Sequence, residues 1–168
     1  MVFLWQNNGT GLLFKDQNSN AKERVAMAID FSISIHSEDI VDQSKIPHIT
    51  LRGGDKMPAI GMGTYHNEIY TYEEVAQAVY GAIHIGYRLI DCASGYQDEP
   101  QIGEALEAVM AEGIRRDQLF ITSKLDTIHM APDEVLPALH RTLRDLRLDY
   151  LDGYYMQYPN CSGQWRNP

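Results

Sequence analysis

The chain has 168 residues, a length that favours one domain and lets about 68–70% of the unfolded chain's surface be buried. Acidic residues outnumber basic ones by 23 to 14, which gives a formal net charge of −9, and no Lys/Arg cluster stands out. Nucleic acid and anionic membrane surfaces are therefore poor partners, and we expect neither.

The first residues of the chain are apolar, but polar residues 6–9 follow them at once. The apolar run is shorter than the core of about 7–15 residues in a signal peptide or the roughly 20 residues of a membrane-spanning helix. The two cysteines, Cys92 and Cys161, are far apart and match no metal-ligand spacing. Isolated thiols are typical of a reducing compartment, so we predict a cytoplasmic protein without a metal site.

Residues 1–46 are rich in Asn, Gln, Ser and Asp, and only residues 21–29 show a weak helical period. A segment of this composition buries little apolar surface, so we predict a loose N-terminal extension. The next stretch, residues 48–58, has two short strand-like runs on either side of Gly53-Gly54. This pattern predicts a β-hairpin with a glycine turn.

From residue 59 onward, strand and helix patterns alternate. Residues 60–63 predict a first strand, and Thr71 and Glu74 match a capping box that opens a first helix. Gly86 is expected to end this helix. Apolar residues at helical spacing predict its buried face: Val75, Ala78, Val79, Ala82 and Ile83.

The same alternation continues through the second half of the chain. A strand at 88–92 precedes a helix at 101–112, and a strand at 119–123 precedes a helix that begins at Pro132. A fourth strand is expected at 154–157. The second helix is predicted to bury Ile102, Ala105, Leu106 and Val109. The third is predicted to place these residues on one face: Val135, Leu136, Leu139, Leu143 and Leu146. Strands that alternate with helices are typical of an α/β fold with a parallel sheet.

Polar side chains stand at the carboxyl ends of three predicted strands. Asp91, Lys124 and Gln157 each end one, and Tyr96 lies in the loop just after the second. Reduction of a carbonyl needs a proton for the developing alkoxide, and a tyrosine with a pKa near ~10 gives it up poorly without a nearby cation. Lys124 could supply this cation, and Asp91 could hold the lysine. Taken singly, the same residues could be a capping carboxylate, a surface aromatic and a solvated strand end.

Residues 86–103 carry a more specific pattern. They read Gly-Tyr-Arg-Leu-Ile-Asp-Cys-Ala, followed at a fixed spacing by Glu99 and by Ile102-Gly103. This closely resembles the first signature of the aldo-keto reductase family. The resemblance implies the N-terminal half of a (β/α)8 TIM barrel at residues 47–160, with the hairpin as a plug at its bottom. Residues 161–168 would then be a short C-terminal tail.

The resemblance also implies an activity: NAD(P)H-dependent reduction of an aldehyde or ketone to an alcohol by hydride transfer. Asp91, Tyr96 and Lys124 match the family's catalytic aspartate, tyrosine and lysine. Gln157 stands where the family usually has histidine, because Leu-Ile-His-Trp-Pro is replaced here by Tyr-Met-Gln-Tyr-Pro. A glutamine amide still donates a hydrogen bond but cannot become cationic, so we expect weaker polarisation of the substrate.

The binding residues implied by the resemblance lie at the ends of the first, second and fourth strands. For the cofactor NADPH they are Gly61, Met62, Gly63, Thr64, Tyr65 and Asp91. For the carbonyl substrate they are Tyr65, Gln157 and Tyr158. Two departures from the family pattern are Asp126, at a position that is often aromatic, and Gly153, at an apolar strand position. Asp126 is close enough in sequence to Lys124 to compete with Asp91 for the lysine.

The resemblance covers four of the eight strands that a closed barrel of about 250 residues requires. The family's nicotinamide-stacking aromatic and its Lys/Arg cluster for the 2′-phosphate belong to the other strands, so activity of the isolated chain is doubtful. An alternative is an inactive truncated remnant that acts, if at all, as an interaction module. Open barrel edges would favour self-association in either case.

Overall fold

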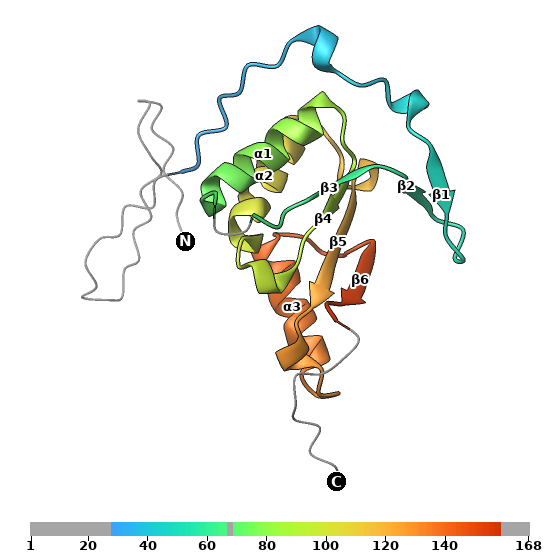
Figure 1. Cartoon of the computed structure of the whole chain (residues 1–168), viewed down its shortest axis with the longest axis vertical. Helices are drawn as coiled ribbons and strands as arrows, with labels where there is room; N and C mark the ends of the chain where they lie inside the picture. The colour runs from blue at the N-terminus through green and yellow to red at the C-terminus, as the bar shows by residue number, and fades with distance from the viewer. Residues whose placement is uncertain (1–27, 67–68, 159–168) are drawn as a thin grey trace, which may run out of the picture. The chain divides into compact units, whose positions relative to one another are not determined.

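The computed structural model describes residues 28–66 and 69–158 (Figure 1). The chain divides into two units, Met1–Asp30 and Phe31–Pro168. In the first unit the described residues, 28–30, have no regular secondary structure. The helical period expected at 21–29 therefore lies mostly outside the described residues, and its last two residues are not helical.

The second unit is built on a parallel four-stranded sheet in the order β3-β4-β5-β6. Its strands are β3 (Gly61–Gly63), β4 (Leu89–Asp91), β5 (Phe120–Leu125) and β6 (Gly153–Met156). The connecting helices are α1 (Tyr72–Ile85), α2 (Glu99–Ala111) and α3 (Val135–Asp145). Figure 1 shows these helices on one face of the sheet. The strand order follows the chain order, as in the first half of a (β/α)8 barrel, and the predicted fold class is confirmed.

The predicted hairpin is also present. β1 (His48–Thr50) pairs antiparallel with β2 (Lys56–Pro58). Gly54 in the turn has φ 99°, which disfavours any residue with a side chain. The turn closes through a hydrogen bond of 2.9 Å from the Gly54 amide to the Leu51 carbonyl.

Helix α1 has the predicted ends. The Thr71 hydroxyl accepts from the Glu74 amide at 3.2 Å, and the Glu74 carboxylate accepts from the Thr71 amide at 2.8 Å. Gly86 follows the helix with φ 120°. Four of the five predicted buried residues are buried, but Ala78 is exposed and Ala76 is buried instead. The buried face is centred on the row of Ala76, Val79 and Ile83, so Ala78 falls outside it.

Helix α2 buries the four apolar residues predicted for it. Gly103 on the same face is also buried, because it lies against the end of α3. A Cβ atom at Gly103 would overlap the carbonyl oxygen of Asp145. The two helices can approach this closely because Gly103 has no side chain. This close approach brings the last turn of α3 onto α2.

The prediction for α3 was wrong at its start and in part of its buried face. Pro132 lies in a turn, and the helix begins at Val135. The residues it buries are Ala138 and Thr142, whereas Leu136 is 62% exposed. Leu146, also predicted on this face, is fully buried just after the helix, whereas Val135, Leu139 and Leu143 are only partly buried.

Part of the segment before the hairpin contacts α1. The Phe31 ring stacks on Tyr80 with centroids 4.9 Å apart, and the Val41 amide donates to the Ile85 carbonyl at 2.7 Å. The Gln43 side chain donates to the carbonyl of Gly86, just after the helix. Residues 31–43 are therefore held to the helix by these contacts. The predicted limits of the N-terminal extension stay a prediction. No helix in the described part of the chain is long and apolar enough to cross a membrane.

Gly153 at the start of β6 makes room for a side chain two residues along the same strand. A Cβ atom at position 153 would overlap the hydroxyl of Tyr155 and would lie 3.1 Å from the Thr122 methyl group. Residues two apart in a strand share a face, so the Tyr155 ring folds back over the glycine. The departure at Gly153 is thus matched by the tyrosine at 155.

We therefore expect Gly153→Leu to lower the free energy of unfolding by about 1–3 kcal/mol through overpacking. In Gly153→Leu/Tyr155→Leu the cost should be smaller than the sum of the two single changes by roughly 1 kcal/mol, because the leucine fills the space that the ring leaves. Urea unfolding of the four proteins measures this coupling. Additive costs would show that Tyr155 does not occupy the space above Gly153.

Glu99, at the start of α2, is a buried carboxyl between the helix and the sheet. It is 3% exposed, and the Ser123 hydroxyl on β5 donates to it at 2.5 Å. Burial raises the pKa of Glu99 from 4.5 to about 7, and the Ser123 hydrogen bond offsets only part of this effect. The folded state therefore binds a proton on Glu99 over a pH range in which the unfolded chain has already lost it.

The raised pKa of Glu99 makes the free energy of unfolding depend on pH. The contribution of Glu99 to stability is complete below its unfolded pKa of 4.5 and is lost as the pH rises to about 7. Glu99→Gln stays neutral, so relative to the wild type it should gain up to roughly 3 kcal/mol at about pH 8 and little at about pH 4. Urea unfolding at both pH values, with the exposed Glu73→Gln as control, measures this difference. An equal effect of Glu99→Gln at both pH values would contradict the assignment.

Candidate active site

The ends of β4 and β5 bring a lysine and an aspartate together. Lys124 Nζ donates to Asp91 Oδ2 at 2.8 Å and to the Cys92 carbonyl at 2.8 Å. The lysine side chain is only 16% exposed, whereas that of Asp91 is 43% exposed. Two charge-assisted bonds therefore fix the position of a mostly buried ammonium group.

Thr122 completes the environment of the aspartate. Its hydroxyl donates to Asp91 Oδ1 at 2.6 Å, so each carboxylate oxygen of Asp91 has a donor. The sequence analysis missed Thr122. A signal was available, because Thr122 is two residues before Lys124 and side chains two apart share a face of a strand.

Tyr96 lies next to the lysine. It ends the short 3-10 helix Ser94–Tyr96, and Lys124 Nζ lies 5.1 Å from the centroid of its ring. The Ser94 hydroxyl donates to the Lys124 carbonyl at 3.1 Å, which ties the loop to β5. The structure thus brings the three predicted catalytic residues, Asp91, Tyr96 and Lys124, into one group.

The balance of burial and charge keeps Lys124 protonated. Burial by itself would lower its pKa, but the hydrogen bond and the negative charge of Asp91 outweigh burial, and Tyr96 acts in the same direction. The net effect raises the pKa of Lys124 above 10.5. A cation therefore stands beside the tyrosine ring throughout the neutral pH range.

The segment expected to contact the cofactor runs beside this group. Gly61, Met62 and Gly63 form β3, and Gly63 pairs in register with Asp91. The Thr64 amide donates to the Asp91 carbonyl at 3.2 Å, and the Tyr65 ring lies 5.1 Å from that of Tyr96. A Cβ atom at Gly63 would meet nothing within 4 Å, so the end of β3 leaves open space next to Asp91.

Gln157 and Tyr158 lie just after β6. The Gln157 amide donates to the Leu125 carbonyl at 3.0 Å, and its side-chain oxygen is buried without a hydrogen-bond partner among the described residues. Tyr158 is 58% exposed. In the described residues, neither side chain has a hydrogen bond or a ring contact with Asp91, Tyr96 or Lys124. Their predicted roles in substrate binding therefore stay predictions.

The expected competition from Asp126 does not occur. Asp126 Oδ1 accepts from the Ile128 amide at 3.3 Å and caps the short 3-10 helix Thr127–His129. Its other oxygen lies 3.4 Å from where a Cβ atom of Gly95 would be. The lysine pairs with Asp91, while Asp126 lies against the loop that carries Tyr96.

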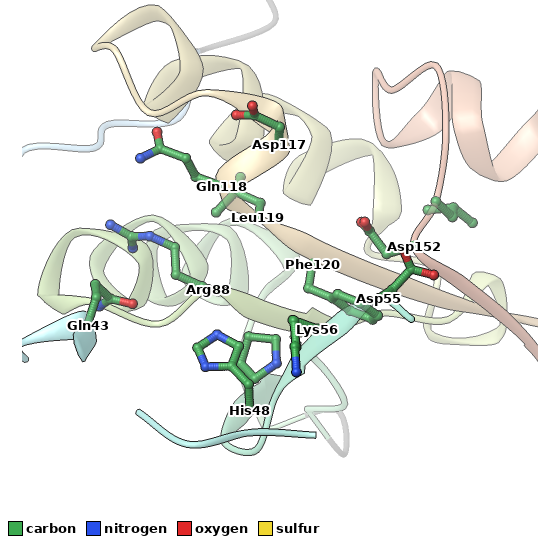
Figure 2. Close-up of a pocket in the computed structure, with 12 residues that line it drawn as sticks. Gln43, His48, Asp55, Lys56, Arg88, Asp117, Gln118, Leu119, Phe120 and Asp152 are labelled. Atoms are coloured by element: carbon green, nitrogen blue, oxygen red, sulfur yellow. The ribbon is translucent and has the colours of Figure 1, made fainter. Parts of the chain in front are cut away.

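A cavity of about 570 Å³ lies at the other end of the strands (Figure 2). Arg88 just before β4, Phe120 at the start of β5 and Asp152 just before β6 line it, together with His48 and Lys56 of the hairpin. Active sites of barrels of this class form at the carboxyl ends of the strands, so this cavity is not the candidate site. A second cavity of about 350 Å³ does reach Asp91 and Thr122 on the inner face of the sheet.

The Asp91–Lys124 pair gives a direct test of the site's geometry. In Asp91→Asn the burial of Lys124 remains while its counter-charge is lost, so the pKa of Lys124 should fall below 10.5 instead of lying above it. NMR titration of the lysine side-chain carbons measures this shift. We also expect unfolding to cost about 1–3 kcal/mol less, between the values typical of exposed and of buried pairs.

Asp126→Asn is the matched control, because it makes the same chemical change beside the same loop. It should leave the pKa of Lys124 above 10.5. A larger fall in Asp126→Asn than in Asp91→Asn would mean that the lysine pairs with the wrong carboxylate in solution.

Comparison with known proteins shows which proteins this chain is similar to. Human aldo-keto reductase family 1 member A1 is 45% identical over 122 residues, which cover 71% of this chain and 37% of that protein. NADPH-dependent codeinone reductase 1-3 of Papaver somniferum is 44% identical over 121 residues, with 71% and 38% covered. The crystal structure of a Bombyx mori aldo-keto reductase in complex with NADP superposes with a TM-score of 0.65 at 42% identity, and the match covers 68% of this chain and 38% of that one.

The chain thus spans 37% of the length of its human relative. The part that matches is the part that holds the site, because the sequence profile described as "Aldo/keto reductase family" fits residues 59–164. This range contains all four strands of the sheet and the group of Asp91, Tyr96 and Lys124. The chain belongs to the aldo/keto reductase family.

Proposed function

We propose that this chain serves the NADPH-dependent reduction of an aldehyde or ketone to an alcohol, and that it holds the proton-donating side of the site. The observation that carries the proposal is the position of Lys124, which Asp91 holds at 2.8 Å while its ammonium group faces the ring of Tyr96. A lysine held in this way is available to stabilise a phenolate.

Each residue of the site has a separate role in the proposed reaction. NADPH, when bound, supplies the hydride that adds to the carbonyl carbon. Tyr96 donates its hydroxyl proton to the carbonyl oxygen, and Lys124 stabilises the negative charge that is left on the phenol oxygen. Asp91 keeps the lysine charged and in place, and Thr122 orients the aspartate. Gln157 would place the substrate through its side-chain amide.

The cofactor would lie along the end of β3 and the neighbouring end of β4. The open space at Gly63 and the position of Tyr65 beside Tyr96 fit a planar ring at this place. Asp91 is half exposed there and can still accept a further hydrogen bond. The cytoplasm stays the proposed compartment, in line with a reducing environment for isolated thiols.

A second candidate function is that of a non-catalytic interaction module. β3 and β6 each pair on one side only within the described sheet, so two strand edges are open. Exposed apolar side chains lie next to these edges, with Ile60 at 52% and Met156 at 66% exposure. Open edges of this kind pair readily with another strand, including one from a second copy of the chain.

A chimera separates the two functions. Residues 59–158 of this chain would replace the matching segment of human aldo-keto reductase family 1 member A1, which is 45% identical over the aligned region. If the segment carries a working site, the chimera reduces an aldehyde with NADPH, and Tyr96→Phe lowers kcat/KM by about 10²–10⁴-fold. Tyr87→Phe, the same change at the opposite end of β4, should have little effect.

Gln157→His in the same chimera tests the substituted position. A histidine can polarise the carbonyl more strongly, so kcat should rise by a few-fold to about 10²-fold. A chimera that folds and binds NADPH but reduces no aldehyde, even with Gln157→His, would contradict the proposed function and favour the interaction module.

A further inference from the structure

Tyr96 is carried by a turn that is too short to fix its own position. The 3-10 helix Ser94–Tyr96 has three residues. The Tyr96 amide donates to the Ala93 carbonyl at 3.0 Å, and the Gln97 amide donates to the Ser94 carbonyl at 3.2 Å. Hydrogen bonds in a 3-10 turn have poor geometry, and no side chain caps the start of this one. The place of the tyrosine ring therefore depends on what the turn is attached to.

The turn begins where the ladder of hydrogen bonds between β4 and β5 ends. The Cys92 amide, one residue beyond β4, donates to the Thr122 carbonyl at 2.8 Å. Bonds in a parallel ladder are evenly spaced, two residues apart on each strand. In a continued ladder the next donor would be the amide of Ser94, and the next acceptor would be the carbonyl of Lys124.

Ser94 takes this place with its side chain. Its hydroxyl donates to the Lys124 carbonyl at 3.1 Å, although its main chain has already turned into the 3-10 helix. The hydroxyl thus extends the ladder by one step after the backbone has left it. In addition, Lys124 Nζ donates to the Cys92 carbonyl at 2.8 Å. The residue that supplies the cation therefore contacts the chain on both sides of Ala93.

The residue after the turn has a backbone conformation that its attachments explain. Gln97 has φ 62° and ψ 17°, in the left-handed region that residues with a side chain rarely adopt. Such a conformation persists where the surrounding structure fixes it. Before Gln97 the turn is bonded to β5 through Ser94, and after it the Glu99 carboxylate accepts from Ser123 of β5 at 2.5 Å. Both sides of the bend are thus attached to the same strand.

We propose that Ser94 is a positioning residue for Tyr96. Its hydroxyl extends the ladder of β4 and β5 and fixes the turn, which sets the place of the Tyr96 ring, 5.1 Å from the Lys124 ammonium group. The effect on proton transfer rests on the proposed function, whereas the hold on the turn does not. Ser94 is half-buried, so in its absence water can bond to the Lys124 carbonyl but leaves the turn unattached. The loss should therefore affect position more than stability.

NMR on the 168-residue polypeptide tests the hold without any need for activity. The Lys124 ammonium group lies over the Tyr96 ring, so the ring current should shift the resonances of the neighbouring ε-methylene group. Tyr96→Leu removes the ring and gives the unshifted reference. In Ser94→Ala we expect these resonances to move most of the way to that reference. Ser94→Thr keeps the hydroxyl and should keep the wild-type values.

Thr71→Ala is the matched control. It also removes a hydroxyl that bonds to the main chain, but this hydroxyl accepts from the Glu74 amide at 3.2 Å at the exposed start of α1. Loss of the cap should lower the free energy of unfolding at least as much as Ser94→Ala does, and it should leave the Lys124 resonances unchanged. Urea unfolding of both variants measures stability, so the comparison separates the position of the turn from general stability.

The chimera tests the effect on the reaction. There Ser94→Ala should lower kcat by roughly 3- to 10-fold, the rate equivalent of one hydrogen bond of ordinary strength. The KM for the aldehyde and the Kd for NADPH should stay unchanged, because the substitution affects an interaction of the transition state. Ser94→Thr should restore kcat, and Thr71→Ala should leave it unchanged.

The hold is contradicted if the Lys124 resonances keep their wild-type values in Ser94→Ala, if Ser94→Thr loses them as well, or if Thr71→Ala moves them equally. The role in the reaction is contradicted if the resonances move while kcat stays unchanged, or if KM changes in place of kcat. Failure of the proposed function is a different result. A chimera that is inactive with the unchanged segment contradicts that function, and the NMR comparison then still decides the hold.

Discussion

Parallel pairing of β4 with β5 is the constraint on which the site depends. The register places Asp91 opposite Thr122, so Lys124, two residues further along β5, reaches Asp91 from the same side. An antiparallel or shifted pairing would separate these three side chains. Because all four strands run in the same direction, their carboxyl ends meet at one edge, and every loop that leaves this edge can contribute to one site.

Three carboxyl groups near the carboxyl end of β4 differ in burial. Asp91 is half exposed and each of its carboxylate oxygens accepts one hydrogen bond, whereas Asp98 and Glu99 are buried at the start of α2 with pKa values raised to about 6 and about 7. The first pairs with the cation of Lys124. Burial raises the pKa values of the other two toward neutral pH, so the stability of the packing at the start of α2 depends on pH.

The departures from the family pattern lie at the end of β5 and in and after β6, and two of the three are accommodated by nearby residues. Gly153 gives room to the ring of Tyr155, which lies over it and is 46% exposed. Asp126 caps its own 3-10 helix and leaves Lys124 to Asp91. Gln157 is the substitution that the described structure does not compensate, because its side-chain oxygen is buried without a partner in that part of the chain.

The sequence by itself determined the family resemblance, the order of strands and helices, the capping box of α1 and the identity of Asp91, Tyr96 and Lys124 as candidates, since these depend on local pattern and spacing. It could not determine which side of α1 is buried around Ala78 or where α3 begins, and for Thr122 it indicated only the face of the strand, not the hydrogen bond to Asp91. Those features are decided by the register of neighbouring strands and by the close approach of α2 and α3 at Gly103. Both are contacts between residues far apart in the chain, which no local periodicity encodes.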